Sequence, residues 1–213
     1  MKRYFHKELT ELENKLILLG EKSHQVVQLA IEGLIENNLD KVNEAYNMDD
    51  YVDVLEMEIS HACIRYMSLR GPVSSDLRLL VVALKASKDF ERIADEAHSI
   101  AQKSYRLLTR EGSLKNTLNL SEMGKLACEL VNDSISCFVE EDIDKAFLIL
   151  KKDHEIDAIN QRHFDTLSNE ASRDEMSDTA RFNLMLISKS IERIGDHAKN
   201  IAGGVIFLLN GDQ

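Results

Sequence analysis

FERIADEAHSIA, residues 90–101, and IERIGDHAKNIA, residues 191–202, are two copies of one amphipathic phrase. Within each copy the apolar residues recur at the three- and four-residue spacing of an α-helix. A Ser-Lys pair precedes the first copy at residues 87–88 and precedes the second at residues 188–189. The repetition therefore predicts two related helices that hold equivalent places in a duplicated fold.

The same helical period extends over the rest of the chain, which contains one proline. It predicts six helices, at about residues 4–37, from Met48 to the Arg-Gly-Pro stop at 70–72, and at 73–108, 118–140, 142–169 and 175–209. Residues 109–116 are expected to be a linker. Short connections between long helices make neighbouring helices antiparallel. We therefore expect an all-α protein of two tandem, pseudo-symmetric three-helix bundles, over residues 1–110 and 117–213.

The charge and the apolar runs exclude several classes of protein. A net charge of −11 disfavours binding to nucleic acid or to anionic membranes. The longest apolar run, Val205–Leu209, cannot span a bilayer, which requires about 20 residues. No apolar signal-peptide core follows the first residues, and the three cysteines have no C-x-x-C spacing. We expect a cytoplasmic protein with no transmembrane segment, no bound nucleic acid and reduced, buried cysteines.

Four acidic pairs stand at a spacing of four residues, which places both members of a pair on one helix face. They occupy equivalent positions in the two halves: Asp49/Asp53, Glu91/Asp95, Asp153/Asp157 and Glu192/Asp196. In each half the two pairs lie at similar distances before and after the predicted turn, so an antiparallel hairpin brings them level. Carboxylates gathered in this way suit a hard cation, whose charge offsets their repulsion. A solvated acidic surface is the alternative for any single pair.

Three further polar residues lie close to these pairs in the sequence. His98 follows Asp95 by three residues and is a candidate nitrogen ligand in the first half. Asn200 is a candidate ligand in the second half, because it follows Asp196 by four residues. His197 is adjacent to Asp196 and points elsewhere on the helix, so we expect it to have a structural hydrogen bond.

Several stretches, taken together, resemble the PhoU family of phosphate-signalling proteins over essentially the whole chain. They are DDYVDVLE at residues 49–56, GPVSSDLR at 71–78 and IERIGDHAKNIA. The resemblance implies two three-helix bundles and multinuclear clusters of iron or zinc held by the same eight carboxylates. It also implies a negative regulator of phosphate uptake and of the phosphate-starvation response. Its implied partners are the ATPase subunit of an ABC-type phosphate transporter and a membrane sensor histidine kinase.

The first copy of the phrase departs from the family pattern at several positions. Ala94, Glu96 and Ser99 replace the usual Gly, His and Asn, and Gln102 and Gly203 stand where the family often has Glu. These departures predict that the first acidic group holds fewer ions or binds them more weakly than the second.

Three functions remain to be compared. The chain contains no phosphate-cradling loop, zinc-protease motif or nucleophile turn, so we expect a regulatory adaptor and not an enzyme. A ferritin-like, di-iron metal-handling protein is an alternative, because Glu21-x-x-His24 and Glu58-x-x-His61 match its Glu-x-x-His motif. A helical interaction module without metal is the third. We expect the chain to form a homo-oligomer.

Overall fold

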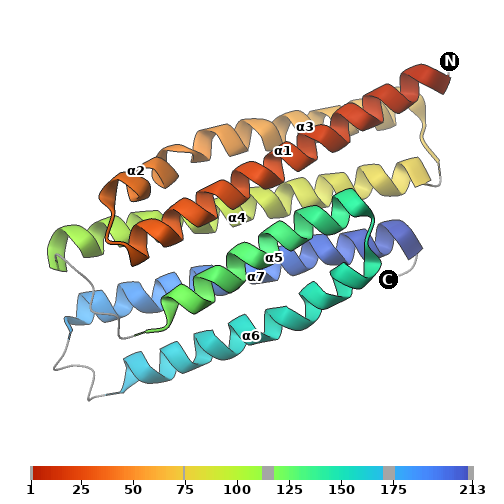
Figure 1. Ribbon diagram of the computed structural model, residues 1–213. Helices are drawn as coiled ribbons and strands as arrows, with labels where there is room; N and C mark the ends of the chain where they lie inside the picture. The colour runs from red at the N-terminus through yellow and green to blue at the C-terminus, as the bar shows by residue number, and fades with distance from the viewer. Residues whose placement is uncertain (1, 74, 112–117, 170–175, 211–213) are drawn as a thin grey trace.

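The computed structural model describes residues 2–73, 75–111, 118–169 and 176–210, and only the backbone of residues 2–6, 49 and 111. This part of the chain forms helices and no strands, as predicted (Figure 1). The helices are α1 (Lys2–Ile35), α2 (Leu39–Asn47), α3 (Asp49–Arg70), α4 (Ser75–Glu111), α5 (Leu120–Glu140), α6 (Ile143–Ser168) and α7 (Asp178–Asn210).

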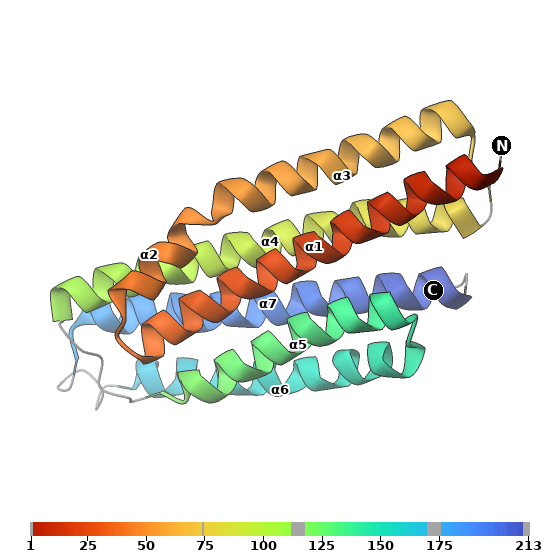
Figure 2. The same ribbon diagram turned by 45° about the horizontal axis from the view of Figure 1, so that its top comes forward.

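The helices form two bundles that lie side by side. The first bundle contains α1, α4 and the consecutive α2 and α3, and the second contains α5, α6 and α7 (Figures 1 and 2). Helices α4 and α7 run antiparallel to each other through the middle of the molecule, and α3 and α6 lie at its outer edges. The two helices that carry the repeated phrase therefore form the main contact between the halves.

The first bundle differs from the prediction in its second helical segment, which is divided at Met48. This residue ends α2 and precedes α3, and its amide donates to the Ala45 carbonyl at 3.4 Å. The amide of Tyr51 in turn donates to the Met48 carbonyl at 3.3 Å. These bonds span three residues and not four, which tightens the chain locally and changes the direction of the helix. No glycine or proline marks this break in the sequence.

The predicted stop after α3 is confirmed at Gly71. Its φ of 56° and ψ of 55° are left-handed, a conformation that glycine adopts without the steric cost of a side chain. Helix α4 extends past its predicted end to Glu111, because residues 109–111 contain no helix breaker. The rest of the predicted linker lies outside the described residues, as does the predicted start of the last helix at residue 175.

Both copies of the repeated phrase present the same apolar positions to one continuous hydrophobic core. In α4 these are Ile93, Ala94, Ala97, Ile100 and Ala101, and in α7 they are Ile194, Gly195, Ala198, Ile201 and Ala202. Gly195, the smallest of them, leaves room for side chains of α6. The same core also receives buried side chains from the other five helices.

The cysteines behave as small apolar groups. Cys63 and Cys137 are buried, Cys128 is half-buried, and all three are free thiols. Burial raises the pKa of Cys63 to about 11 and those of Cys128 and Cys137 to about 12. The thiols are therefore protonated at neutral pH, which makes them poor nucleophiles and poor metal ligands. None of the described helices is both long enough and apolar enough to cross a lipid bilayer.

A buried histidine, His163, pairs with a serine in the core of the second bundle. Ser188 donates to the Asn160 side chain at 2.9 Å, so His163 Nδ1, 2.9 Å from Ser188 Oγ, is the donor to that hydroxyl. The remaining ring nitrogen, Nε2, is buried with no hydrogen-bond partner among the described residues. Burial lowers the pKa of His163 below its usual value of 6.5, and burial of His24 acts in the same direction.

We expect the free energy of unfolding to fall as the pH drops below about 6.5. In that range His163 and His24 bind protons in the unfolded chain but remain neutral in the folded protein, which favours unfolding. The slope is at most about 1.4 kcal/mol per pH unit for one histidine. Urea denaturation at several pH values between 7.5 and 5.5 measures it, and the His163→Gln variant should show a flatter dependence. An unchanged slope in that variant would assign the acid sensitivity to other groups.

Candidate metal centre

The first acidic group joins α3 to α4. Asp53 of α3 and Glu91 and Asp95 of α4 each place a carboxylate oxygen within 4.8 Å of the others. The predicted antiparallel hairpin therefore brings these side chains level. Asp49, the fourth predicted member, begins α3, but its side chain lies outside the described part of the structure.

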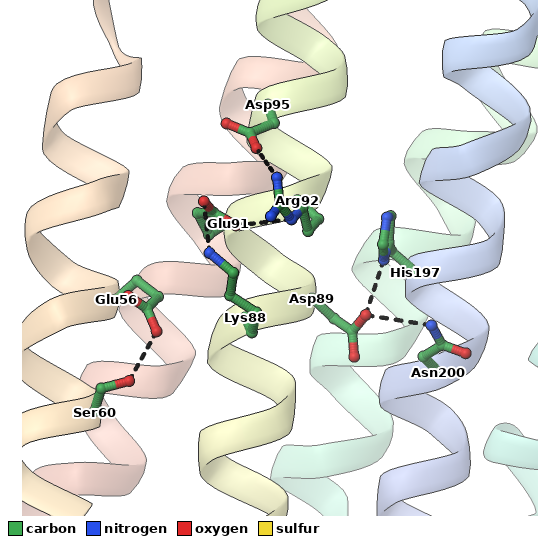
Figure 3. Close-up of polar contacts among 9 residues, drawn as sticks. All are labelled: Glu56, Ser60, Lys88, Asp89, Glu91, Arg92, Asp95, His197 and Asn200. Carbon is green, nitrogen blue, oxygen red and sulfur yellow. Dashed lines mark hydrogen bonds and ion pairs between the residues drawn. The ribbon is translucent and has the colours of Figure 1, made fainter.

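Two cations from α4 pair with the Glu91 and Asp95 carboxylates of this first acidic group (Figure 3). Lys88 Nζ lies 2.8 Å from Glu91 Oε1, and Arg92 Nη1 lies 2.9 Å from Asp95 Oδ2. The Arg92 Nε atom is 3.6 Å from Glu91 Oε2, too far for a hydrogen bond. The Glu91 side chain is only 12% exposed, and its Oε2 atom is buried without a hydrogen-bond partner in the described structure.

His98 lies one helical turn beyond Asp95, outside the group of three carboxylates. Its ring packs against Tyr46 of α2, with the ring centroids 4.3 Å apart. This contact packs the imidazole against the last turn of α2. The structure thus places the predicted nitrogen ligand close to the group but does not bring it into the set of mutually close donors.

The second acidic group lies on α6. Asp153, His154 and Asp157 place one potential ligand atom each within 4.8 Å of the others. The Asp153 side chain is 1% exposed, and its Oδ1 atom is buried without a hydrogen-bond partner among the described residues. The predicted α7 members, Glu192 and Asp196, are outside this set of mutually close atoms.

A lysine of α7 reaches into the second group. Lys199 Nζ donates to Asp153 Oδ2 at 2.6 Å. That hydrogen bond, followed by the negative charges of Asp153, Asp196 and Asp157, raises the pKa of Lys199 above its usual value. The ammonium therefore lies in the combined field of three of the four carboxylates that the sequence predicted as ligands.

The other predicted residues of α7 have partners elsewhere. The Lys189 ammonium lies 2.6 Å from both carboxylate oxygens of Glu192, and its hydrogen bond goes to Oε1. The Asn200 amide donates to Asp89 Oδ1 of α4 at 3.3 Å. Asn200 therefore bridges the two halves of the molecule in this structure and contacts neither Asp153 nor Asp157 through a hydrogen bond described here.

Polar contacts between α4 and α7 fix the relative position of the two halves (Figure 3). His197 Nδ1 lies 2.8 Å from the same Asp89 oxygen that accepts from Asn200. Arg193 Nη1 donates to Glu96 Oε1 at 3.1 Å. The structural hydrogen bond expected for His197 is therefore present. Arg193 of the second phrase pairs with the neighbouring helix, whereas the equivalent Arg92 of the first phrase pairs within its own helix.

Two residues of the second group, His154 and Lys199, did not emerge from the sequence pattern. His154 is 75% exposed and its Nδ1 atom lies 3.7 Å from Asp157 Oδ2. Its spacing of three residues from Asp157 was a usable signal, because such residues share a helix face. Lys199 follows Asp196 at the spacing that His98 has from Asp95, but its contact with Asp153 is made between two helices by a long side chain, which spacing does not predict.

The PhoU domain pattern matches this chain twice, at residues 16–104 and 120–205. The two matches coincide with the two bundles and cover most of the chain. This chain belongs to the PhoU family. The duplicated phrase thus reflects two PhoU domains in tandem, one in each bundle.

Individual PhoU relatives cover nearly the full chain. A phosphate-specific transport system accessory protein PhoU homolog of Xylella fastidiosa strain 9a5c is 35% identical over 97% of this chain and 86% of its own length. A homolog of the same description from Aquifex aeolicus is 32% identical over 97% of this chain and 93% of its own length. The crystal structure of PhoU from Pseudomonas aeruginosa superposes with a TM-score of 0.93 at 28% identity, covering 98% of this chain and 100% of that one.

The donors of the first acidic group fit a metal ion of the kind that the resemblance to the PhoU family implied. Three carboxylates offer hard oxygen ligands, and Glu91 Oε2 is a buried acceptor without a hydrogen bond among the described residues, which a cation would satisfy. Lys88 and Arg92 are half-exposed, so both can move into solvent at small cost. Asp53, Glu91 and Asp95 would hold the ion, with His98 nearby.

The motifs of the ferritin-like alternative do not lie at a buried centre. Glu21, Glu58 and His61 are exposed, and His24 is half-buried. Glu58 pairs with Lys15 at 2.6 Å on the surface of the first bundle. Di-iron centres of that class require these side chains to project into the bundle interior.

Proposed function

We propose that this protein is a negative regulator of phosphate uptake and of the phosphate-starvation response. The observation that carries the proposal is the match of both bundles to the PhoU domain, together with relatives described as accessory proteins of a phosphate-specific transport system. The match extends over almost the whole of this chain and of those relatives, so the function is transferred between proteins of the same architecture.

The protein acts as an adaptor and not as a catalyst. Its contacts would be with the ATPase subunit of an ABC-type phosphate transporter and with a sensor histidine kinase. Exposed apolar side chains support a role in protein contacts, and several lie on α3, the outermost helix of the first bundle: Tyr51, Val54, Met57, Ile64 and Leu69. The same surfaces would serve a homo-oligomer. A cytoplasmic location gives access to both partners and keeps the three thiols reduced.

A bound metal ion, iron or zinc, is the second part of the proposal. It is supported by the three converging carboxylates of Asp53, Glu91 and Asp95 and by the buried Oε2 atom of Glu91, which has no hydrogen bond among the described residues. Its role would be to neutralise the group and to tie α3 to α4. Elemental analysis of protein purified without chelators tests it. Metal-free protein that also fails to take up iron or zinc would reduce the function to that of a metal-free interaction module.

Deletion of the gene should raise alkaline phosphatase expression and phosphate uptake in cells grown with abundant phosphate. The reason is that a negative regulator restrains both when phosphate is plentiful. Reporter activity and uptake of labelled phosphate measure the change, and the native gene on a plasmid should reverse it. Unchanged expression and unchanged uptake in the deletion strain would refute the regulatory role without bearing on metal binding.

A further inference from the structure

The two acidic groups differ in the residue that occupies one equivalent position. Lys199 of the second phrase stands 101 residues after His98 of the first, so the two residues hold the same place on α7 and α4. In the first half this place carries an imidazole, which is able to ligate a metal. In the second half it carries a permanent ammonium, which cannot.

We propose that Lys199 is a tethered cation that takes the place of a metal ion in the second acidic group. The proposal rests on the metal-binding function proposed above. It assigns the bound metal of this protein to the first half, around Asp53, Glu91 and Asp95. The departures of the first phrase from the family pattern predicted the opposite, namely weaker metal binding by the first acidic group than by the second.

The geometry of Asp153 carries the proposal. Its carboxylate is 1% exposed, and Lys199 Nζ lies 2.6 Å from Oδ2. A carboxylate buried to this degree needs a compensating positive charge, because removing it from water is otherwise very unfavourable. Lys199 supplies that charge. A second ion would have to displace the ammonium, and this lowers the apparent affinity of the second group for metal.

The backbone of α7 is shaped for this contact. A Cβ atom at Gly195 would lie 3.1 Å from Asp153 Oδ1 and 3.2 Å from the end of Ile156, closer than an unstrained contact. Gly195 therefore makes the space in which the Asp153 carboxylate sits beside α7. Oδ1, the oxygen that faces Gly195, is the atom without a hydrogen-bond partner, so a single ammonium satisfies only one side of this carboxylate.

The cations of the first group are held differently. Lys88 and Arg92 are 50% and 52% exposed, and each pairs with a residue of its own helix. Surface ion pairs of this kind contribute little and are easily exchanged. Lys199 is 33% exposed, and its partner belongs to another helix. Metal can therefore replace the cations of the first group more readily than the lysine of the second.

The test measures metal binding by the second acidic group after the ligands of the first group have been removed by substitution. In the Glu91→Gln/Asp95→Asn background, metal bound to the chain reports on the second group alone. Titration with Mn²⁺, which prefers oxygen ligands and is detected by EPR, should show little binding in this background. Adding Lys199→His, which copies the first half, should tighten Mn²⁺ binding by at least about tenfold, or about 1.4 kcal/mol.

Lys152→His in the same background is the matched control. Lys152 neighbours Asp153 in the sequence but pairs with Asp133 at 3.4 Å and with Glu129 at 3.9 Å, away from the second acidic group. This variant loses the same charge and gains the same imidazole, and its Mn²⁺ affinity should not change. Lys199→Gln, which keeps a donor for Asp153, provides a second variant if Lys199→His folds poorly, and it should also tighten binding.

The outcomes distinguish this proposal from the proposed metal-binding function. If the Glu91→Gln/Asp95→Asn protein retains half of the native metal and neither Lys199 variant changes its affinity, the tethered-cation proposal is wrong although the protein binds metal. If native protein binds no Mn²⁺ but the Lys199 variants do, the metal-binding function of the native chain is wrong and the role of Lys199 stands. If none of these proteins binds Mn²⁺, both proposals fail.

Discussion

Replacing Glu91 by Gln and Asp95 by Asn together should remove most of the metal that the native protein binds. The two substitutions keep the size of the side chains but delete two of the three converging negative charges. Loss of an outer hydrogen-bonding partner alone typically weakens a metal site by about 10–100-fold, so loss of two ligands should exceed 100-fold. Elemental analysis and isothermal titration with Zn²⁺ or Fe²⁺ measure the loss.

Glu56→Gln is the control for that experiment. Glu56 is an acidic residue of α3 that accepts from Ser60 at 2.8 Å (Figure 3) and does not belong to the set of mutually close carboxylates. Its replacement removes one negative charge from the same bundle and should leave the metal content unchanged. Equal metal content in native protein and in the Glu91→Gln/Asp95→Asn variant would show that these carboxylates are not ligands.

Gly33→Ala should destabilise the protein by about 1–3 kcal/mol, the usual range for forcing an extra group into a packed site. A Cβ atom at this position would lie 2.7 Å from Val42 Cγ2 and 2.9 Å from the Val42 backbone nitrogen. It would also lie 3.2 Å from the Asn38 carbonyl oxygen, so the start of α2 would have to shift as a unit. Urea denaturation measures the loss in the free energy of unfolding.

The same substitution at Gly203 has the opposite expected sign. Gly203 is a helical residue of α7, and a Cβ atom there would meet nothing within 4 Å. Ala is a better helix former than Gly by about 0.5–1 kcal/mol, so Gly203→Ala should stabilise the protein slightly. If both variants lost the same stability, the close approach of α1 and α2 at Gly33 would not be the cause.

The position of α2 matters for the first acidic group as well as for stability. Helix α2 carries Tyr46, whose ring packs on His98, and α3, which follows it, carries Asp53. A shift of α2 would therefore move a predicted nitrogen ligand and a predicted oxygen ligand together. We expect Gly33→Ala to weaken metal binding to a smaller extent than the Glu91→Gln/Asp95→Asn substitutions do.

Local periodicity predicted most of the helices because their signals are contained in short segments. Three signals were sufficient to predict the two bundles and the helix faces that enter the core. They are the apolar residues at helical spacing, the stop at Gly71 and Pro72, and the duplicated phrase. The break at Met48 was not predictable in this way. It contains no glycine or proline, and it is visible only in the hydrogen bonds from Met48 to Ala45 and from Tyr51 to Met48.

The candidate metal centre was predictable only in part, and for a similar reason. Counting residues from the turn was sufficient to predict that Asp53 lies level with Glu91 and Asp95, because an antiparallel hairpin fixes the position of each residue along the helix axis. Counting does not fix the rotation of one helix against another. The rotation of α7 about its axis decides that the Asn200 side chain points toward α4, where it donates to Asp89 of the first half.

By itself, the sequence determined that this protein is a duplicated helical protein with matched acidic pairs, because helical period and repeat spacing are properties of the chain alone. Only the tertiary structure decided what neutralises each pair. A side chain as long as that of Lys199 can reach several positions on neighbouring helices, and its partner is chosen by the packing of α6 on α7. Charge compensation at Asp153 therefore depends on distances across helices, which no spacing along the chain specifies.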